Sequence, residues 1–274
     1  MSIEKKDSVG ILGCGWLGLP LAQHLVNQGY DVHGSSTQKE KLPLIAATGA
    51  IPAIVHCDES EAIGLSAFLK KIDCLILTLP PGIRKDPKRR FDHVIKTIHR
   101  EVIKQGVQKV IFISSTAVYG DAKGRIDEST PTTAVTESGK QLVRCEQQWL
   151  TTPGLNATIL RFGGLVGPNR HPIYALAKRD RIDNPKGKIN FIHLNDCIKL
   201  ISLCLNSSRS TGIFNGVSPY HPHREQYYLH MAKLAGIKLP HFDSNQSHER
   251  VISSQKAENE LGMHFAVDNL LTLN

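Results

Sequence analysis

The chain has no long apolar run and no paired-cysteine motif, and each absence excludes a class of protein. No window holds the roughly 18 consecutive apolar residues that cross a bilayer, and the N-terminal MSIEKKDS lacks the apolar core of a secretory signal. We therefore expect a cytoplasmic protein that does not enter a membrane. The 41% hydrophobic and 21% charged residues exclude disordered, collagen-like and coiled-coil chains.

The six cysteines never form a Cys-x-x-Cys pair, and most fall inside expected strands or helices. We interpret them as small buried thiols without disulfide, redox or metal roles. They are Cys14, Cys57, Cys74, Cys145, Cys197 and Cys204. The one local cluster among the 13 histidines is His221 and His223, which offers too few ligands for a metal ion. We predict no metal site.

Basic residues outnumber acidic ones by 33 to 25, and the formal net charge of +8 favours anionic ligands. Because no aromatic residues alternate with the densest basic cluster, we do not expect nucleic-acid binding. The cluster either lies in solvent at the start of a helix or attracts the phosphates of a nearby nucleotide. It consists of Arg84, Lys85, Lys88, Arg89 and Arg90.

Short apolar segments alternate with helical patterns through most of the chain. The expected strands cover residues 8–12, 31–36, 51–56, 73–79, 108–114, 157–162 and 189–193, and the expected helices cover residues 18–28, 39–47, 61–71, 88–105, 137–151 and about 173–180. This alternation predicts an α/β Rossmann fold, a doubly wound parallel sheet with its first strand central. Ligands of such a sheet bind beyond the carboxyl ends of the strands, where the strand order reverses.

The pattern becomes irregular after Arg161, which predicts a smaller C-terminal lobe that binds the substrate. We assign residues 1–165 to the dinucleotide-binding domain, with residues 189–216 completing it. Residues 166–188 and 217–274 form the smaller lobe. Arg161, in a strand, and the turn of Asn169, Arg170 and His171 either meet an anionic substrate from the smaller lobe or pair with local carboxylates.

The stretch SVGILGCGWLGLPLAQHL at residues 8–25 combines an apolar strand, three glycines and a helix. In a Gly-x-Gly-x-x-Gly motif, Gly13 makes the tight turn, Gly15 lets a pyrophosphate approach the backbone, and Gly18 packs the helix against the strand. The phosphates then lie at the positive end of the helix dipole. We predict these cofactor-binding residues: Gly13, Cys14, Gly15, Trp16, Leu17, Gly18, Ser36, Thr37, Lys39, Asp58, Leu79, Pro80 and Ser114.

The end of the second strand indicates which dinucleotide binds. NAD-binding proteins of this type place an acidic residue there for the ribose 2′-hydroxyl, whereas this chain has Ser35, Ser36 and Thr37. Because Lys39 and Lys41 supply positive charge nearby, we expect NADP in preference to NAD. Asp58, after the third strand, either contacts the adenine or caps the following helix.

The segment SSTAVYG at residues 114–120 resembles the extended short-chain dehydrogenase/reductase superfamily of NAD-dependent epimerases and dehydratases. The resemblance continues through the DEST-P segment at 127–131, RFGGLVGP at 161–168 and FIHLND at 191–196. The short loop GCGWLG is more similar to an atypical bacterial branch, the YeeZ-like proteins. The resemblance implies a nicotinamide cofactor and a small-molecule substrate, such as a nucleotide sugar or another anion.

The catalytic residues implied by the resemblance are a Ser and a Tyr-x-x-x-Lys pair, in which the Lys lowers the pKa of the Tyr. Ser115 matches the Ser. Aligning ESGKQLVRCEQQW with the superfamily puts Ser138 in the Tyr position and Leu142 in the Lys position. Thr136 and Lys140 have the Tyr-to-Lys spacing after a shift of two residues. We therefore predict altered catalysis, with Ser115, Ser138 and Lys140 as candidate catalytic residues, and expect Tyr119 to pack in the cleft wall.

Three functions fit these observations. The first is an NADP-binding oxidoreductase with altered catalysis. The second is a nucleotide-sugar epimerase or dehydratase with surrogate acid–base groups, and the third is a non-catalytic sensor of NADP(H). The resemblance also implies a homodimer through the helices at 88–105 and 137–151, although one subunit could use the same apolar stripes internally.

Overall fold

The computed structural model describes residues 7–83, 86–239, 241–243 and 249–272. Arg84 and Lys85 of the basic cluster lie outside the described residues. Seven parallel strands form the central sheet, in the order β12-β9-β7-β6-β1-β2-β3. Their bounds are β1 Ser8–Leu12, β2 Asp31–Ser36, β3 Ile51–Ile54, β6 Cys74–Leu77, β7 Lys109–Ser115, β9 Asn156–Phe162 and β12 Gly212–Gly216.

The strand order reverses between β1 and β6. The chain runs outward from β1 to β3, returns to β6 beside β1, and then runs outward to β12. This is the predicted doubly wound Rossmann topology, and it places the switch point directly beside the glycine loop that follows β1.

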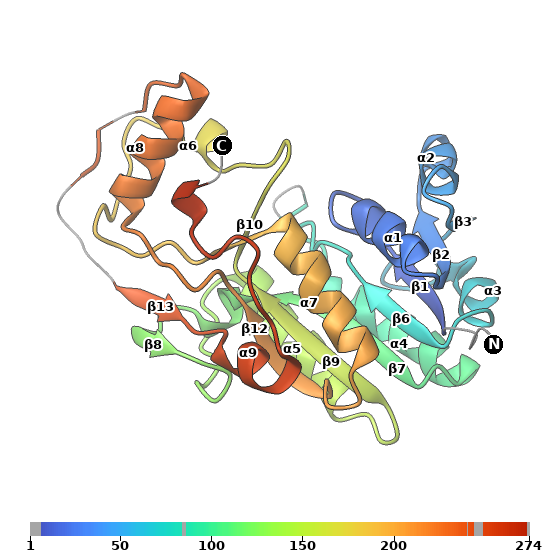
Figure 1. The fold of residues 1–274 in the computed structure, drawn as a ribbon. Coiled ribbons are helices and arrows are strands. Elements are labelled where there is room, and N and C mark those ends of the chain that lie inside the picture. Colours follow the sequence, from blue (N-terminus) through green and yellow to red (C-terminus); the bar gives the residue numbers. More distant parts are fainter. Residues whose placement is uncertain (1–6, 84–85, 240, 244–248, 273–274) are drawn as a thin grey trace.

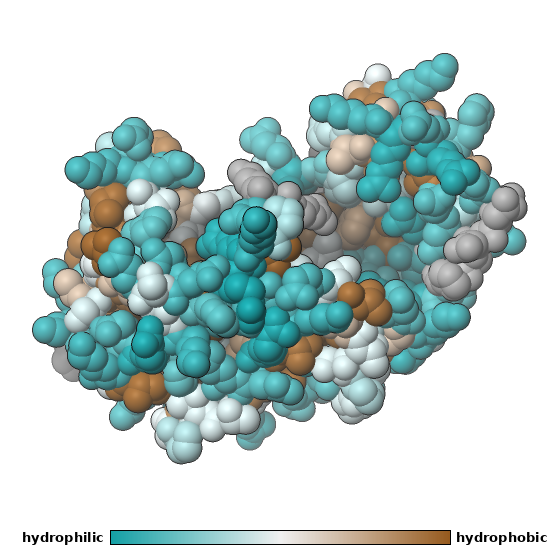
Figure 2. Space-filling model, turned by 180° about the vertical axis from the view of Figure 1, so that it is seen from behind, coloured by the Kyte–Doolittle hydropathy of each residue, from teal (hydrophilic) through white to brown (hydrophobic). Residues whose placement is uncertain are grey.

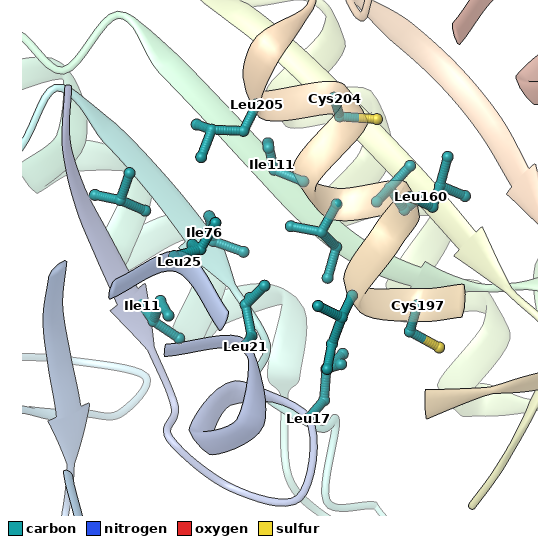
Figure 3. Packing of buried hydrophobic residues seen from close by; sticks show 14 of the residues in the cluster. Ile11, Leu17, Leu21, Leu25, Ile76, Ile111, Leu160, Cys197, Cys204 and Leu205 are labelled. Atoms are coloured by element: carbon teal, nitrogen blue, oxygen red, sulfur yellow. The ribbon is translucent and has the colours of Figure 1, made fainter. Parts of the chain in front are cut away.

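Helices cover both faces of the sheet (Figure 1). One face packs against α1 (Gly18–Asn27), α7 (Leu194–Asn206) and α9 (Gln255–Leu261), and the other against α3 (Leu65–Leu69), α4 (Phe91–Gln105) and α5 (Glu137–Leu150). Strand side chains alternate between the two cores: on β6, Cys74 and Ile76 face the first, and Leu75 and Leu77 the second. Figure 3 shows Leu21 and Leu25 of α1 beside Ile11 and Ile76, within the same core as Cys204 and Leu205 of α7.

Several expected elements differ from the structure. The strand expected at 51–56 ends at Ile54, and an antiparallel hairpin of β4 (His56–Cys57) and β5 (Ala62–Ile63) follows. The helix expected at 39–47 divides into the short turn η1 (Lys39–Lys41) and α2 (Leu42–Ala46). The strand expected at 189–193 is β11 (Phe191–His193), which pairs with β10 (Gly164–Val166) outside the central sheet. The seventh sheet strand is instead β12.

A third hydrophobic core lies away from the sheet. It joins α6 (Ile173–Leu176), α8 (Arg224–Ala235) and η3 (Leu270–Thr272) to β10 and β11. Its buried residues are Val166, Leu176, Ile182, Ile189, Tyr227, Tyr228 and Leu270. Residues 257–263 pack on the sheet instead, and β13 (Arg250–Ile252) pairs with β8 (Gly124–Ile126). That the third core belongs to a substrate-binding lobe stays a prediction.

Seen from behind, the surface is hollowed between the part formed by α6 and α8 and the rest of the molecule (Figure 2). Most of this face is hydrophilic, with apolar residues in small scattered groups. Among the described residues, no helix has the length and apolar character needed to span a membrane.

Candidate functional site

The glycine loop is held by the strands on either side of β1. The Gly13 N–H donates to Ser35 Oγ at 3.1 Å, and the Cys14 N–H donates to the Ser35 carbonyl at 2.8 Å. From the other side, Thr78 Oγ1 donates to the Gly13 carbonyl at 2.6 Å. Gly13 has a φ of 107°, which explains why this position is a glycine. The loop is therefore fixed before any ligand arrives.

Gly18 and Gly15 lack a side chain for different reasons. A Cβ on Gly18 would lie 2.3 Å from the Gly13 carbonyl oxygen, so the start of α1 can reach the loop only without one. Gly15 is exposed, has no positive φ, and a Cβ placed there would meet no described atom within 4 Å. The packing of the protein itself does not require a glycine at position 15. A ligand that came close to this backbone would require one.

The first turn of α1 offers donors to such a ligand. Leu17, in the N-cap position, has no polar side chain with which to cap the helix, and no acidic residue lies in the first turn. The first N–H groups of a helix lack the partners that its later ones have. Here the Leu19 N–H donates to the Gly15 carbonyl at 3.0 Å and Pro20 has no N–H, so the donors that remain are those of residues 16–18. Together with the helix dipole they form an anion site.

Trp16 connects the glycine loop to the turn at residues 167–170. Its indole Nε1 donates to the Pro168 carbonyl at 2.8 Å. The Arg170 guanidinium lies over the indole, 4.9 Å from the ring centre. A Cβ on Gly167 would lie 3.2 Å from the indole, so this turn approaches the loop closely. The sequence motif contained the tryptophan, but no local signal pointed to its partner.

At the end of β2, polar and basic side chains lie at the surface. Thr37 and Lys39 are exposed, as is Lys41, and Ser36 Oγ accepts from the Gln38 N–H at 3.0 Å. Ser35 is buried in holding the glycine loop. Across β6, Leu79 and Pro80 follow the strand end and lie at the surface or half-buried beside the loop.

Asp58 shapes a turn of the β4–β5 hairpin. Its Oδ1 accepts from the backbone N–H groups of Ser60 and Glu61 and from the Ser60 hydroxyl, at 2.8–2.9 Å. The backbone hydrogen bonds with Glu61 and Ser60, with the Ser60 hydroxyl, lower the pKa of Asp58 to about 2. The alternative prediction that Asp58 caps the following helix is wrong, because the N-cap residue of α3 is Gly64. The adenine contact stays a prediction.

Below the end of β7, Ser114 belongs to a buried polar network. Ser114 donates to Glu146 on α5. The same carboxylate accepts from Arg161 Nη2 at 2.6 Å and from Nε at 3.1 Å, and both side chains are about 3–4% exposed. Arg161 is thus paired with a local carboxylate, one of its two expected roles.

Tyr119 is fully buried beside this network, and its expected place in a cleft wall stays a prediction. The Arg161 guanidinium stacks 4.9 Å from the centre of the Tyr119 ring. The Tyr119 hydroxyl donates to Asn215 Oδ1 at 2.8 Å, and no part of the Tyr119 side chain is exposed. Burial raises the pKa of Tyr119, although the neighbouring Arg161 opposes this. A buried phenol with a raised pKa is poorly suited to exchanging a proton with a bound molecule.

The three candidate catalytic residues do not share one face. Ser115 follows Ser114, is half-buried, and accepts from the Ala117 N–H at 3.2 Å. Ser138 is half-buried in the first turn of α5, next to Gly139, which packs on the Ala117 carbonyl. Lys140 is exposed, and two residues turn an α-helix by about 200°. Ser115 and Ser138 therefore come from adjoining elements, whereas Lys140 lies on the outer side of α5.

In the turn that follows β10, His171 is already hydrogen-bonded within the protein. His171 Nδ1 accepts from the Ile173 N–H at 3.1 Å, so its other nitrogen carries the proton beside the Tyr227 hydroxyl, 2.8 Å away. Burial lowers the pKa of His171 to about 4, and the ring is neutral near pH 7. Of the expected anion contacts in this turn, Arg170 alone carries a charge.

The described residues include all six cysteines. All six cysteines are free, five are buried and Cys57 is half-buried. Burial raises the pKa of the Cys14 thiol in the glycine loop to about 12, so it is not a nucleophile. Within the described part of the chain, no three metal-binding side chains form a group.

Comparison with known proteins adds to this geometry. A family model described as NAD(P)H-binding matches residues 13–191. The chain is 34% identical over 276 residues to protein YeeZ of Escherichia coli strain K12, covering 97% of this chain and 98% of that protein.

Two solved structures show the same fold. WbmG of Bordetella bronchiseptica, in complex with NAD, has a TM-score of 0.78 at 18% identity and covers 98% of this chain and 92% of its own. The UDP-glucose 4-epimerase of Thermotoga maritima, with UDP-glucose, has a TM-score of 0.79 at 16% identity and covers 97% and 95%. At such identities the likeness concerns the fold alone.

Proposed function

This chain belongs to the NAD(P)H-binding family and is a homologue of the YeeZ proteins, and we propose that it is an NADP(H)-dependent oxidoreductase with altered catalytic residues. The observation that carries the proposal is Gly15. It is exposed, faces open space, and lies between a fixed turn and an uncapped helix start. We infer that a pyrophosphate binds here, held by the N–H groups of residues 16–18, because the Gly15 N–H already donates to the Gly13 carbonyl at 2.7 Å.

NADP(H) supplies or accepts a hydride at its nicotinamide ring. The proteins of this superfamily that the chain resembles pair that hydride with a proton from a tyrosine. Here Ser138 and Leu142 stand in the positions of the Tyr and Lys. The hydroxyls of Ser115 and Ser138 can hydrogen-bond a substrate oxygen, but an aliphatic hydroxyl transfers a proton poorly near neutral pH. We infer slow turnover, with Lys140 a weaker candidate because of its outward position.

The proposal is tested by the fluorescence of the two tryptophans, Trp16 and Trp149. Trp16 lies in the glycine loop, and Trp149 is fully buried against His99 in the α4–α5 core. We expect NADPH to quench the emission of Trp16 and to receive its excitation energy. A Trp16→Phe variant should lose most of that response, and Trp149→Phe should keep it. No saturable response at millimolar NADPH, or equal responses from both variants, would contradict the site.

The preference for NADP is tested at Ser36. A Ser36→Asp variant puts a carboxylate at the end of β2, and its oxygen can still accept from the Gln38 N–H. Repulsion of the 2′-phosphate should weaken NADPH binding about tenfold or more, with little effect on NADH. Ser36→Asn, which has the same shape without charge, is the matched control. If the NADPH-to-NADH affinity ratio is the same in both variants, the phosphate does not bind there.

Two other functions remain as alternatives. A nucleotide-sugar epimerase or dehydratase would turn over a panel of sugar nucleotides, and Ser115→Ala would abolish that activity. A non-catalytic sensor is favoured by the contact between Trp16 and Pro168, through which cofactor occupancy could reach the other lobe. A sensor would bind NADP and NADPH with different affinities and would retain a partner in only one of the two states.

A further inference from the structure

Two helices on the same face of the sheet carry polar stripes that face each other. At the end of α1, His24 and the C-cap residue Gln28 lie one turn apart. On α7, the stripe follows spacings of four, three and four residues: Asn195, Lys199, Ser202 and Asn206. Such spacings put side chains on one face of a helix. With Ile198 and Leu203, these residues line a cavity of about 390 Å³. None of them belongs to the glycine loop.

Two buried polar atoms in the wall of this cavity lack a partner. Ser202 is 7% exposed, and among the described residues its Oγ has no hydrogen-bond partner. The same holds for His24 Nε2. Leaving a buried polar group unsatisfied costs about 1–3 kcal/mol. Nearby groups are already paired with each other, since Asn206 Nδ2 donates to the Ser202 carbonyl and Asn206 Oδ1 accepts from Tyr30.

The charge on the residues that line the cavity is positive. Lys199 is its cation, and no Asp or Glu is among the residues that line the cavity. The Lys199 ammonium donates one hydrogen bond to the His264 carbonyl, which leaves two of its three N–H groups for other acceptors. The lining therefore favours an anion over a cation.

We propose that the cavity between α1 and α7 is a second binding site, for a small oxyanion such as a phosphate or carboxylate. The Lys199 ammonium and the Ser202 hydroxyl donate to its oxygens, and the His24 ring contributes its unpaired nitrogen. His24 lies six residues beyond Gly18, or about 9 Å along the axis of α1. This site is separate from the glycine loop and stands without the proposed function.

The experiment titrates the full chain, uniformly labelled with ¹⁵N, with inorganic phosphate and separately with citrate. Chloride keeps the ionic strength constant, and chloride alone serves as the blank. The His24 ring signals are assigned by their loss in His24→Gln. We expect them to shift and saturate with one of the two anions, and the better anion distinguishes a phosphate site from a carboxylate site.

Variants separate the cavity from surface binding. Ser202→Ala and Lys199→Gln should each weaken the anion at least about fivefold. Lys233→Gln, which removes a lysine from the last turn of α8, should leave the affinity unchanged. Gly15→Val should also leave it unchanged, because that residue serves the cofactor. If neither anion saturates the His24 signals, or if Lys199→Gln binds as tightly as the unaltered chain, the cavity holds only water and the proposal fails.

Discussion

Replacing Glu146 by alanine is expected to lower the free energy of unfolding by about 3–5 kcal/mol, because the buried Arg161 guanidinium loses its counter-charge. Both side chains are nearly inaccessible to water, and the carboxylate accepts from both Arg161 and Ser114. Arg161 Nη1 already has no described partner. The remaining charge would therefore be poorly satisfied. Urea unfolding followed by circular dichroism measures the loss.

Two further variants show whether charge is the cause. Glu146→Gln keeps the shape but removes the charge, so it should also destabilise the fold, though less than alanine. The double variant Glu146→Met, Arg161→Met removes both charges and should recover much of the stability, as buried pairs replaced by apolar residues often do. A cost below about 1 kcal/mol for Glu146→Ala, in the range of a surface ion pair, would show that water reaches Arg161.

A Gly15→Val variant is expected to lose NADPH affinity by at least about 100-fold while it unfolds at the same urea concentration as the unaltered chain. The first side-chain carbon meets no described atom within 4 Å, and the backbone there is one that other residues adopt. The branched side chain instead occupies the space that the pyrophosphate needs. Affinity is measured by the Trp16 fluorescence titration or by calorimetry.

Gly18→Ala provides the opposite case. Its Cβ would clash with the Gly13 carbonyl oxygen at 2.3 Å, so this variant should lose stability together with binding. Gly15→Ala, with a smaller side chain, should reduce affinity less than valine does. If Gly15→Val binds NADPH normally, the phosphates lie elsewhere, and the argument from the open position fails.

The sequence predicted the elements whose signals are local. The bounds of β1 and β2 match the structure, and α1 and α5 match within one residue at each end, because an apolar run, glycines or a capping threonine mark them. β12 was missed because GIFNG is short and begins and ends in glycine. Its place in the sheet depends on pairing with β9, more than 50 residues earlier in the chain. The β4–β5 hairpin was missed because an aspartate turn resembles a helix cap in sequence.

The candidate site likewise combines features that the sequence shows with features that depend on packing. The three glycines, the serine-rich end of β2 and the absence of a Tyr-x-x-x-Lys pair from residues 137–149 are visible in the sequence. The support of Gly13 by Ser35 and Thr78 depends on neighbouring strands. The outward position of Lys140 depends on the rotation of α5. Such facts follow from packing between distant segments, which residue spacing does not encode.

The bond from the Trp16 indole to Pro168 joins residues 152 positions apart. During synthesis, Trp16 is made 152 residues before its acceptor Pro168. The glycine loop can therefore form this contact only after the turn at residues 167–170 has been synthesised.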